Sequence, residues 1–136
     1  MKYNGQIHFL ELQRRAIERI RKIDPDVPII VASTKHDYSN MKPFLYSNII
    51  YTLHYYNPGT YTHQGVNSNP VGYEYPGNYS NVWWNKTQII KDISGFYNFT
   101  KKYNAKGYIG EFSAIRWAKG NTQYISDLID IFEDYG

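Results

Sequence analysis

The sequence predicts an α/β fold built on a small parallel sheet. Two observations carry this prediction. Apolar runs of strand length alternate along the chain with longer segments that have helical periodicity. In addition, Val27–Ala32 is apolar without the in-out alternation of a half-exposed strand, which is typical of strands buried on both faces of a parallel sheet. Strands that alternate with helices pair in parallel through right-handed crossovers.

The first predicted helix carries an apolar stripe that runs from Phe9 to Ile23. Apolar residues recur there at spacings of three and four, which predicts a stripe facing the core, while arginines take the outward positions. Asp24-Pro25-Asp26 is expected to end the helix, because the residue before a proline avoids the helical region. The predicted buried stripe consists of Phe9, Leu12, Ala16, Ile20 and Ile23.

Two strands and a long loop are expected in the middle of the chain. Val27–Ala32 is the first strand, and a polar connection over 33–47 holds at most a short helix near Met41. The second strand is Ile49–Tyr56. The following segment, 57–84, contains three prolines, and a long segment without periodicity is uncommon in a compact domain unless it is functional. We therefore expect 57–84 to be a loop on the substrate side of the fold.

The last third of the chain predicts a helix, a strand and a helix. Helical spacing returns over 86–103, with Asn85 as its N-cap. Lys106–Ser113 is a short run rich in aromatic and β-branched residues and predicts a buried strand. A final helix is expected to begin at Asn121 or Thr122. Its predicted buried face consists of Ile125, Leu128, Ile129 and Phe132.

Composition limits the classes of function. The 136 residues fit a single domain, 1–136, and the net charge of +3 without a Lys/Arg run longer than two argues against a nucleic-acid partner. The absence of cysteine excludes disulfides and thiolate chemistry. No apolar stretch approaches the ~18 residues of a membrane span, and the charged first twenty residues do not resemble a signal peptide. Fifteen tyrosines and three tryptophans favour a surface that contacts flat, hydroxyl-rich partners.

Three polar residues are expected at the carboxyl ends of the strands, where α/β proteins place their chemistry. Glu111 lies near the end of the last strand, and His54 and Tyr56 are two apart on the second strand, so both point to one face. Glu111 as a solvated charge and His54 as a core histidine remain alternatives. The sequence contains no phosphate-binding glycine loop and no GxSxG motif. Its histidines lack metal-ligand spacing; they are His8, His36, His54 and His63.

Several motifs, in order, resemble the carboxyl-terminal half of glycoside hydrolase family 5, the cellulase-type (β/α)8 barrels. His54-Tyr55-Tyr56 is similar to the His-x-Tyr at the end of strand six of that family, and Thr62-His63-Gln64-Gly65 to the loop that follows. Gly110-Glu111-Phe112 resembles the end of strand seven. Residues 16–25 resemble the helix after strand four, and 27–33 resemble strand five. The resemblance implies a half TIM barrel with about three parallel strands, roughly strands five to seven.

The resemblance also implies a chemistry. Glu111 would be the nucleophile of a retaining β-glycosidase acting on a β-linked polysaccharide or oligosaccharide such as β-glucan, and no metal or organic cofactor would be needed. Tyr56 would orient the Glu111 carboxylate, and His54 would contact the sugar and support the general acid/base. Aromatic residues are candidate platforms for sugar rings, with packing inside the protein as the alternative for each. These candidates are Tyr61, His63, Trp83, Trp84 and Trp117.

One departure from the family leaves alternatives open. The family's general acid/base lies in an Asn-Glu-Pro motif, and no Asn-Glu pair occurs in this chain. Glu11 is expected in a helix beyond the corresponding strand and does not inherit the role. The chain is therefore expected to be either a hydrolase or a catalytically incomplete half-barrel that binds carbohydrate. Its partners would include a second copy of itself or a missing amino-terminal half-barrel. Family members are commonly secreted, although these residues show no localisation.

Overall fold

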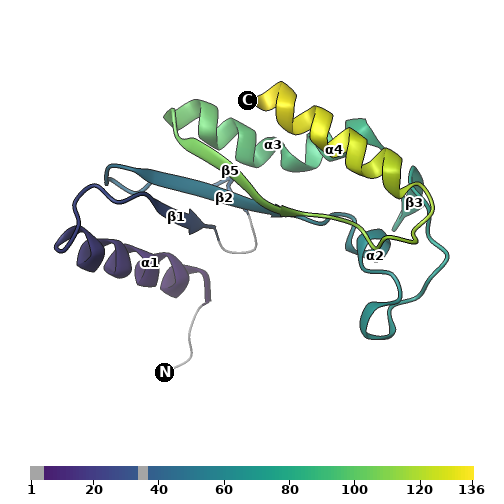
Figure 1. Cartoon of the computed structure of the whole chain (residues 1–136), viewed down its shortest axis with the longest axis horizontal. Helices are drawn as coiled ribbons and strands as arrows, with labels where there is room; N and C mark the ends of the chain where they lie inside the picture. Colours follow the sequence, from purple (N-terminus) through teal and green to yellow (C-terminus); the bar gives the residue numbers. More distant parts are fainter. Residues whose placement is uncertain (1–4, 34–36) are drawn as a thin grey trace. The chain divides into compact units, whose positions relative to one another are not determined.

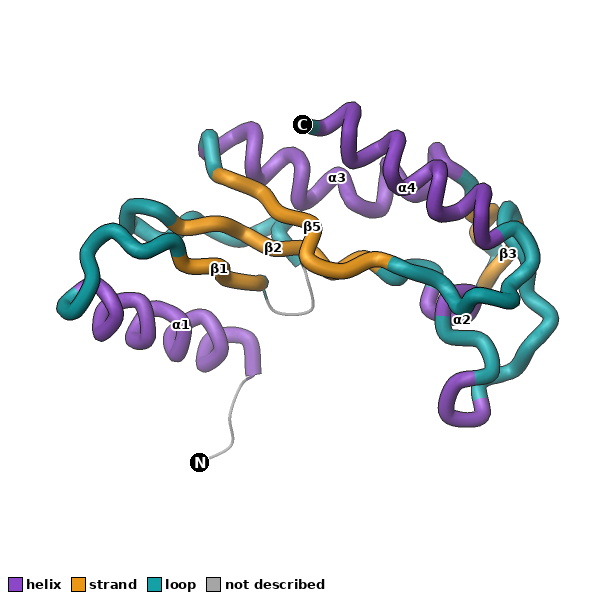
Figure 2. Tube along the Cα trace, viewed as in Figure 1, coloured by secondary structure: helices purple, strands orange, loops and turns teal. Residues whose placement is uncertain are grey.

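The computed structural model describes residues 5–33 and 37–136, with side chains described from residue 9 onward outside 34–36. Helices and strands alternate along the chain (Figures 1 and 2). In chain order the elements are α1 (Gly5–Arg21), β1 (Ile29–Ala32), β2 (Ile49–Tyr55), α2 (Gly59–Thr62), η2 (Val66–Ser68), β3 (Gly77–Tyr79), β4 (Val82–Trp84), α3 (Lys86–Tyr103), β5 (Lys106–Phe112) and α4 (Asn121–Tyr135).

The main sheet contains three strands in the order β1-β2-β5. β1 pairs with β2 in parallel, in a register that joins Ile29 to Ile49 and Ala32 to Thr52. β3 and β4 form a separate antiparallel pair. The predicted α/β class, with three parallel strands alternating with helices, is confirmed.

Local sequence signals account for two of the helix boundaries. The Asn85 side chain accepts a hydrogen bond from the Gln88 backbone N–H at 3.0 Å, which is the predicted N-cap of α3. After α1, the Asp24 carboxylate accepts bonds from the backbone N–H groups of Asp26 at 3.0 Å and Val27 at 2.9 Å. This local turn directs the chain out of the helix and into β1.

The chain divides into two compact units. The first comprises Met1–Leu53 and Gly95–Gly110, and the second comprises His54–Ser94 and Glu111–Gly136. Strands β2 and β5 each contribute to both units. The single-domain assignment for 1–136 stays a prediction. No helix in the described part of the chain has the combination of length and apolarity that a membrane crossing needs.

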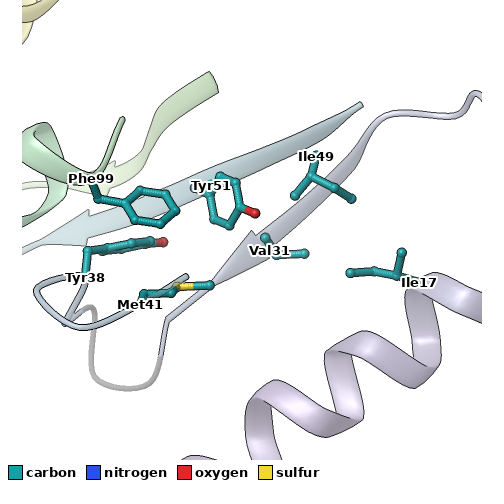
Figure 3. Packing of buried hydrophobic residues seen from close by; sticks show 7 residues of the cluster. All are labelled: Ile17, Val31, Tyr38, Met41, Ile49, Tyr51 and Phe99. Carbon is teal, nitrogen blue, oxygen red and sulfur yellow. The ribbon is translucent and has the colours of Figure 1, made fainter. Parts of the chain in front are cut away.

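Aromatic and aliphatic side chains form the core of the first unit (Figure 3). The Tyr38 ring packs against Phe99 at a centroid distance of 5.2 Å, and its hydroxyl donates to the Thr52 carbonyl at 2.5 Å. Burial raises the pKa of Tyr38 to about 12. The buried cluster consists of Ile17, Val31, Tyr38, Met41, Ile49, Tyr51 and Phe99.

The predicted buried face of α1 is wrong. Ile17 is 1% exposed and packs in the core, whereas Leu12 and Ile23 from the predicted stripe are 61% and 88% exposed. The side-chain carboxamide of Gln13 donates to the Ala32 carbonyl at 2.8 Å and accepts from the Ala32 N–H at 3.0 Å. Gln13 and Ile17 therefore face β1, and this contact fixes the rotation of the helix.

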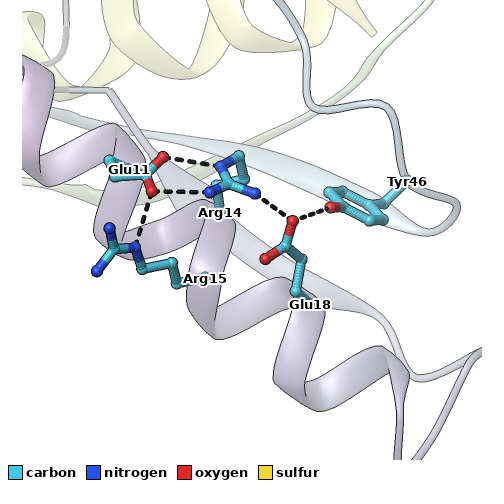
Figure 4. A network of polar contacts seen from close by, with 5 residues as sticks. All are labelled: Glu11, Arg14, Arg15, Glu18 and Tyr46. Carbon is cyan, nitrogen blue, oxygen red and sulfur yellow. Dashed lines mark hydrogen bonds and ion pairs between the residues drawn. The ribbon is translucent and has the colours of Figure 1, made fainter.

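A polar network runs along α1 (Figure 4). Arg14 donates two hydrogen bonds of 2.7 Å to the two carboxylate oxygens of Glu11 and also pairs with Glu18. Arg15 donates to Glu11 at 2.8 Å. Hydrogen bonds from Arg14 and then Arg15 lower the pKa of Glu11 to about 2. Glu11 is therefore a structural ion-pair partner on this helix.

Tyrosines form the core of the second unit. Tyr61 and Tyr124 are both 0% exposed, with ring centroids 5.4 Å apart, and the Tyr75 ring packs against Tyr124 at 5.2 Å. The Tyr75 hydroxyl donates to the buried Asp127 carboxylate at 2.7 Å. Burial first, and then this bond, raise the pKa of Tyr75.

The tyrosine core corrects the predicted face of α4. Leu128 is buried as expected, but Ile129 is 42% exposed, and Ile125 and Phe132 are only partly buried. The helix turns Tyr124 and Asp127 inward instead, because both have partners in the core. The Tyr124 ring packs edge-on against Tyr75, and the Asp127 carboxylate accepts a hydrogen bond from the Tyr75 hydroxyl.

The long segment 57–84 is more ordered than its composition predicts. It contains α2, η2 and the β3–β4 pair. Its bends are stabilised by Gln64, a buried side chain that is 1% exposed. The Gln64 amide donates to the carbonyls of Tyr61 and Tyr73, and its oxygen accepts from the N–H groups of Gly72 and Tyr73, all at 3.1–3.2 Å.

Candidate active site

Glu111 lies near the carboxyl end of β5 with its side chain 54% exposed, inside the second unit. The Tyr56 hydroxyl donates a hydrogen bond of 3.0 Å to Oε2 of Glu111. His54 Nδ1 lies 3.5 Å from the same oxygen. The three residues that the sequence placed at the strand ends are therefore brought together around one carboxylate oxygen.

The Tyr56 hydroxyl is suited to its role as donor. Partial desolvation, followed by the bond to the Glu111 carboxylate, raises the pKa of Tyr56 above its usual value. The phenol therefore keeps its proton at neutral pH and continues to donate to the carboxylate. A charge-assisted bond of this kind fixes one oxygen of Glu111 and leaves the other available to a reacting group.

Thr62, which the sequence analysis did not single out, connects the β2 end to the following helix. Its hydroxyl donates to the Tyr56 carbonyl at 2.6 Å and lies 2.8 Å from Nδ1 of His63. Because a hydroxyl has one proton, a Thr62 that donates to Tyr56 can only accept from His63. This arrangement favours the Nδ1–H tautomer of His63 and leaves Nε2 as an acceptor. The His63 ring also packs edge-on against Tyr56, at 5.1 Å.

Asp92 of α3 also supports this strand end. One of its carboxylate oxygens accepts bonds from the Tyr55 hydroxyl at 3.0 Å and from the Asn57 amide at 2.8 Å. The Tyr124 hydroxyl donates to the Asn57 carbonyl at 2.9 Å. These contacts hold the residues on either side of Tyr56. No local sequence signal identifies Asp92, because its partners are more than thirty residues away in the chain.

The candidate platform residues fall into two groups. Trp83 and Trp117 are 56% and 57% exposed, and Trp84 and His63 are partly exposed. Tyr61 is fully buried, and its hydroxyl donates to the Lys119 carbonyl at 3.1 Å. Tyr61 therefore offers no ring face to a sugar. It is a core residue, and the expectation that it is a sugar platform is wrong.

A glycine positions Trp117. Gly65 has φ of 76°, and a Cβ at this position would lie 3.0 Å from the Trp117 indole. The indole therefore rests against the backbone where only glycine leaves room. The backbone N–H of Ile115 also donates to the Thr62 carbonyl at 3.0 Å, which joins the segment after β5 to α2.

A pocket of about 400 Å³ opens beside this cluster. It is lined by Gly59, Thr60, His63, Asn69 and Pro70. His63 connects the pocket to the candidate catalytic residues. Its ring packs edge-on against Tyr56, and the same residue lines the pocket. The pocket is therefore connected to Glu111 only indirectly, through the contacts of His63 with Tyr56 and of Tyr56 with Glu111.

Several other carboxylates of the second unit have partners away from Glu111. Asp92 binds Tyr55 and Asn57, Asp127 binds Tyr75, and Asp130 pairs with Lys86 at 2.8 Å. Glu74 pairs with Lys119. These contacts leave Glu111 as the carboxylate that the two strand ends converge on.

Among the side chains of residues 9–33 and 37–136, no group of three or more histidines, aspartates or glutamates is arranged to hold a metal ion. Two of the four histidines considered from the sequence, His8 and His36, lie outside the residues whose side chains are described.

Comparisons with known proteins agree with the geometry. The model of the cellulase family, glycosyl hydrolase family 5, matches residues 4–136. The chain is 25% identical to Endoglucanase C of Acetivibrio thermocellus over 156 residues, which cover 92% of this chain and 46% of that protein. It therefore spans less than half the length of this relative.

Solved structures give the same result. A hyperthermophilic endo-β-1,4-glucanase in complex with substrate is 27% identical, with a TM-score of 0.78 over 92% of this chain and 42% of that chain. The Thermotoga maritima enzyme in complex with mannotriose is 26% identical, with a TM-score of 0.80 over 96% of this chain and 45% of that chain. The fold is therefore that of part of these larger proteins.

Proposed function

This chain belongs to the cellulase family, glycosyl hydrolase family 5, and from this premise we propose that it carries the nucleophile side of a retaining β-glycosidase site. The observation that carries the proposal is the convergence of Tyr56 and His54 on Glu111, at 3.0 and 3.5 Å. Glu111 is the nucleophile, and Tyr56 orients its carboxylate. His54 contacts the sugar beside the reacting carbon.

The reaction proceeds in two steps. In the first, a Glu111 carboxylate oxygen attacks the anomeric carbon, the bond from that carbon to the leaving oxygen breaks, and a glycosyl ester forms. In the second, water attacks the same carbon and releases Glu111. A natural leaving sugar needs a proton from a second carboxylic acid. This chain has no Asn-Glu pair to supply that acid in the family's usual place.

The substrate class is a β-1,4-linked polysaccharide, with an endoglucanase-type action. Exposed Trp83 and Trp117, together with Trp84, offer ring faces to pyranose sugars, and the pocket beside His63 would receive the adjoining sugar. Structures of the Thermotoga maritima relative contain cellobiose in one case and mannotriose in another. Gluco- and manno-configured substrates should therefore both be tried.

A substrate with an activated leaving group tests the nucleophile without the missing acid. In 2,4-dinitrophenyl β-cellobioside the phenolate departs without protonation, so the first step needs only Glu111. We expect a burst of about one phenolate per chain and a cellobiosyl adduct on Glu111 by mass spectrometry. Glu111→Gln should give neither. Equal release from both proteins, or an adduct on another residue, would overturn the assignment.

The alternative is a half-barrel that binds carbohydrate without cleaving it. The lack of an Asn-Glu pair favours this alternative. It predicts heat of binding with cello-oligosaccharides but no burst with the activated substrate. A further alternative is that two copies assemble and complete each other's site. Sedimentation of the chain with and without substrate would detect such a dimer.

A further inference from the structure

Thr62, the last residue of α2, is 4% exposed and contacts the segments that follow β2 and β5. Its carbonyl accepts a hydrogen bond of 3.0 Å from the N–H of Ile115, which follows β5. Its hydroxyl lies 2.6 Å from the Tyr56 carbonyl, just after β2, and 2.8 Å from Nδ1 of His63. The hydroxyl therefore joins Tyr56, which bonds Glu111, to a ring that lines the pocket.

The single proton of this hydroxyl determines which nitrogen of His63 carries a proton. The Tyr56 carbonyl can only accept, and at 2.6 Å it is nearer to the Thr62 hydroxyl than the Pro58 carbonyl is at 3.4 Å. The hydroxyl therefore donates to Tyr56 and offers a lone pair to Nδ1, which must carry a proton to bond it. A neutral imidazole has one N–H group, so Nε2 is left with a lone pair.

Backbone contacts hold His63 in place beside the pocket. Its N–H donates to the Gly59 carbonyl at 3.0 Å, and its carbonyl accepts from the Val66 N–H and the Asn69 side-chain amide, both at 3.1 Å. Gly59 and Asn69 also line the pocket. Because both the backbone and the Nδ1 edge of the ring are fixed, His63 needs little rearrangement to bind a ligand through Nε2.

We propose that Thr62 is a positioning residue, which keeps His63 in the Nδ1–H tautomer so that Nε2 accepts a hydrogen bond from a sugar hydroxyl in the pocket. A hydroxyl donor satisfies this lone pair. A group that can only accept, such as an ether or carboxylate oxygen, meets a second lone pair and is disfavoured. This inference rests on the proposed carbohydrate substrate, but the tautomer is measurable without any sugar.

The first measurement uses the 136-residue chain alone. Long-range proton–nitrogen correlation NMR at about pH 9, where imidazole rings are neutral, distinguishes the nitrogen that carries the proton from the nitrogen that carries the lone pair. His63→Gln identifies the His63 signals by their loss. We expect the Nδ1–H form in the parent chain, and a predominant Nε2–H form would overturn the inference.

Substitutions at Thr62 separate the hydroxyl from the shape of the side chain. Thr62→Val keeps the volume but removes the acceptor for Nδ1–H. The Nε2–H form should therefore appear, and the affinity for cellobiose should fall roughly 2–10-fold, the effect of one neutral hydrogen bond. Thr62→Ser retains the hydroxyl and should retain both the tautomer and the affinity.

Thr87→Val makes the same change at an exposed threonine of α3 and is the matched control, which should behave like the parent chain. Circular dichroism checks the fold of each variant, and Thr62→Ala takes the place of Thr62→Val if the latter does not fold. The parent tautomer and affinity in a folded variant that lacks the hydroxyl would overturn the role of Thr62.

The ligand is tested by adding cellobiose to the parent chain. It should shift the Nε2 resonance of His63 more than the Nδ1 resonance, whereas glycerol at the same concentration should not. No shift with cellobiose, or an equal shift with glycerol, would overturn the assignment of a sugar hydroxyl to the pocket. These spectra require no turnover. A shift with cellobiose but no burst with the activated cellobioside would therefore overturn the nucleophile and leave this inference intact.

Discussion

At the scale of single residues, Tyr56 defines the orientation of the Glu111 carboxylate. Its hydroxyl lies 3.0 Å from Oε2, and its backbone carbonyl is held by Thr62 at 2.6 Å. The tyrosine is thus anchored by its main chain while its side chain positions the Glu111 carboxylate, the proposed nucleophile. His63, which packs on the Tyr56 ring, extends the same arrangement toward the neighbouring pocket.

Tyr56→Phe should therefore slow the first step of the proposed reaction. A hydrogen bond to a charged group contributes about 1.5–3 kcal/mol, which corresponds to a roughly 10–100-fold lower burst rate with the activated cellobioside. Stopped-flow absorbance of the released phenolate measures this rate. Tyr108→Phe, a change at an exposed tyrosine in the first unit, is the control and should leave the rate unchanged. An unaltered rate in Tyr56→Phe would contradict the orienting role.

At the scale of elements, the segment 57–84 depends on one buried amide. Gln64 satisfies four backbone groups with one carboxamide and is 1% exposed. Few other side chains could do so, because the site needs two donors and two acceptor directions in one plane. This explains how a segment rich in proline and glycine holds a defined path beside the candidate site.

Replacing this amide should loosen the segment. Gln64→Leu keeps a similar volume but removes the partners of two N–H groups and two carbonyls, at a cost of about 2 kcal/mol or more. Urea unfolding followed by circular dichroism measures the loss. Gln88→Leu on α3 is the comparison, since the Gln88 backbone bond to Asn85 survives the change. Equal stability of Gln64→Leu and the parent chain would refute the role assigned to this residue.

At the scale of the whole molecule, the buried tyrosines make the free energy of unfolding depend on pH in the alkaline range. Burial raises the pKa of Tyr61 and of Tyr79 to about 12, against an ordinary value near 10. A tyrosine whose pKa is higher in the folded state than in the unfolded state contributes its full stabilisation at pH values below the unfolded-state pKa. This contribution is lost as pH rises from about 10 through about 12.

The free energy of unfolding should accordingly fall as pH rises above about 10. Denaturant titrations at several values from pH 8 to 12 would measure it. Lysines also titrate in this range, so Tyr79→Phe is the discriminating variant: it removes one tyrosine contribution, leaves the lysines in place, and should show a shallower decline. A stability that stays constant up to pH 11.5, or identical slopes for the two proteins, would be incompatible with this account.

The sequence by itself determined the order of the main elements and which three polar side chains meet at the strand ends. Strand-length apolar runs and helical spacing predicted β1, β2, β5 and the three long helices. These signals are local, because each is contained in the sequence of a single helix or strand. The strand-end rule predicted that His54, Tyr56 and Glu111 would meet, since parallel strands bring their carboxyl ends to one edge.

Only the tertiary structure decided which helix faces are buried and which polar groups hold the site. The α1 stripe is exposed because Gln13 and Ile17 contact β1 instead, and Tyr61 is buried because other tyrosines surround it. Asp92 and Thr62 gained their roles from partners in other elements. These outcomes depend on which segments fold against one another, and periodicity within one segment carries no information about its neighbours.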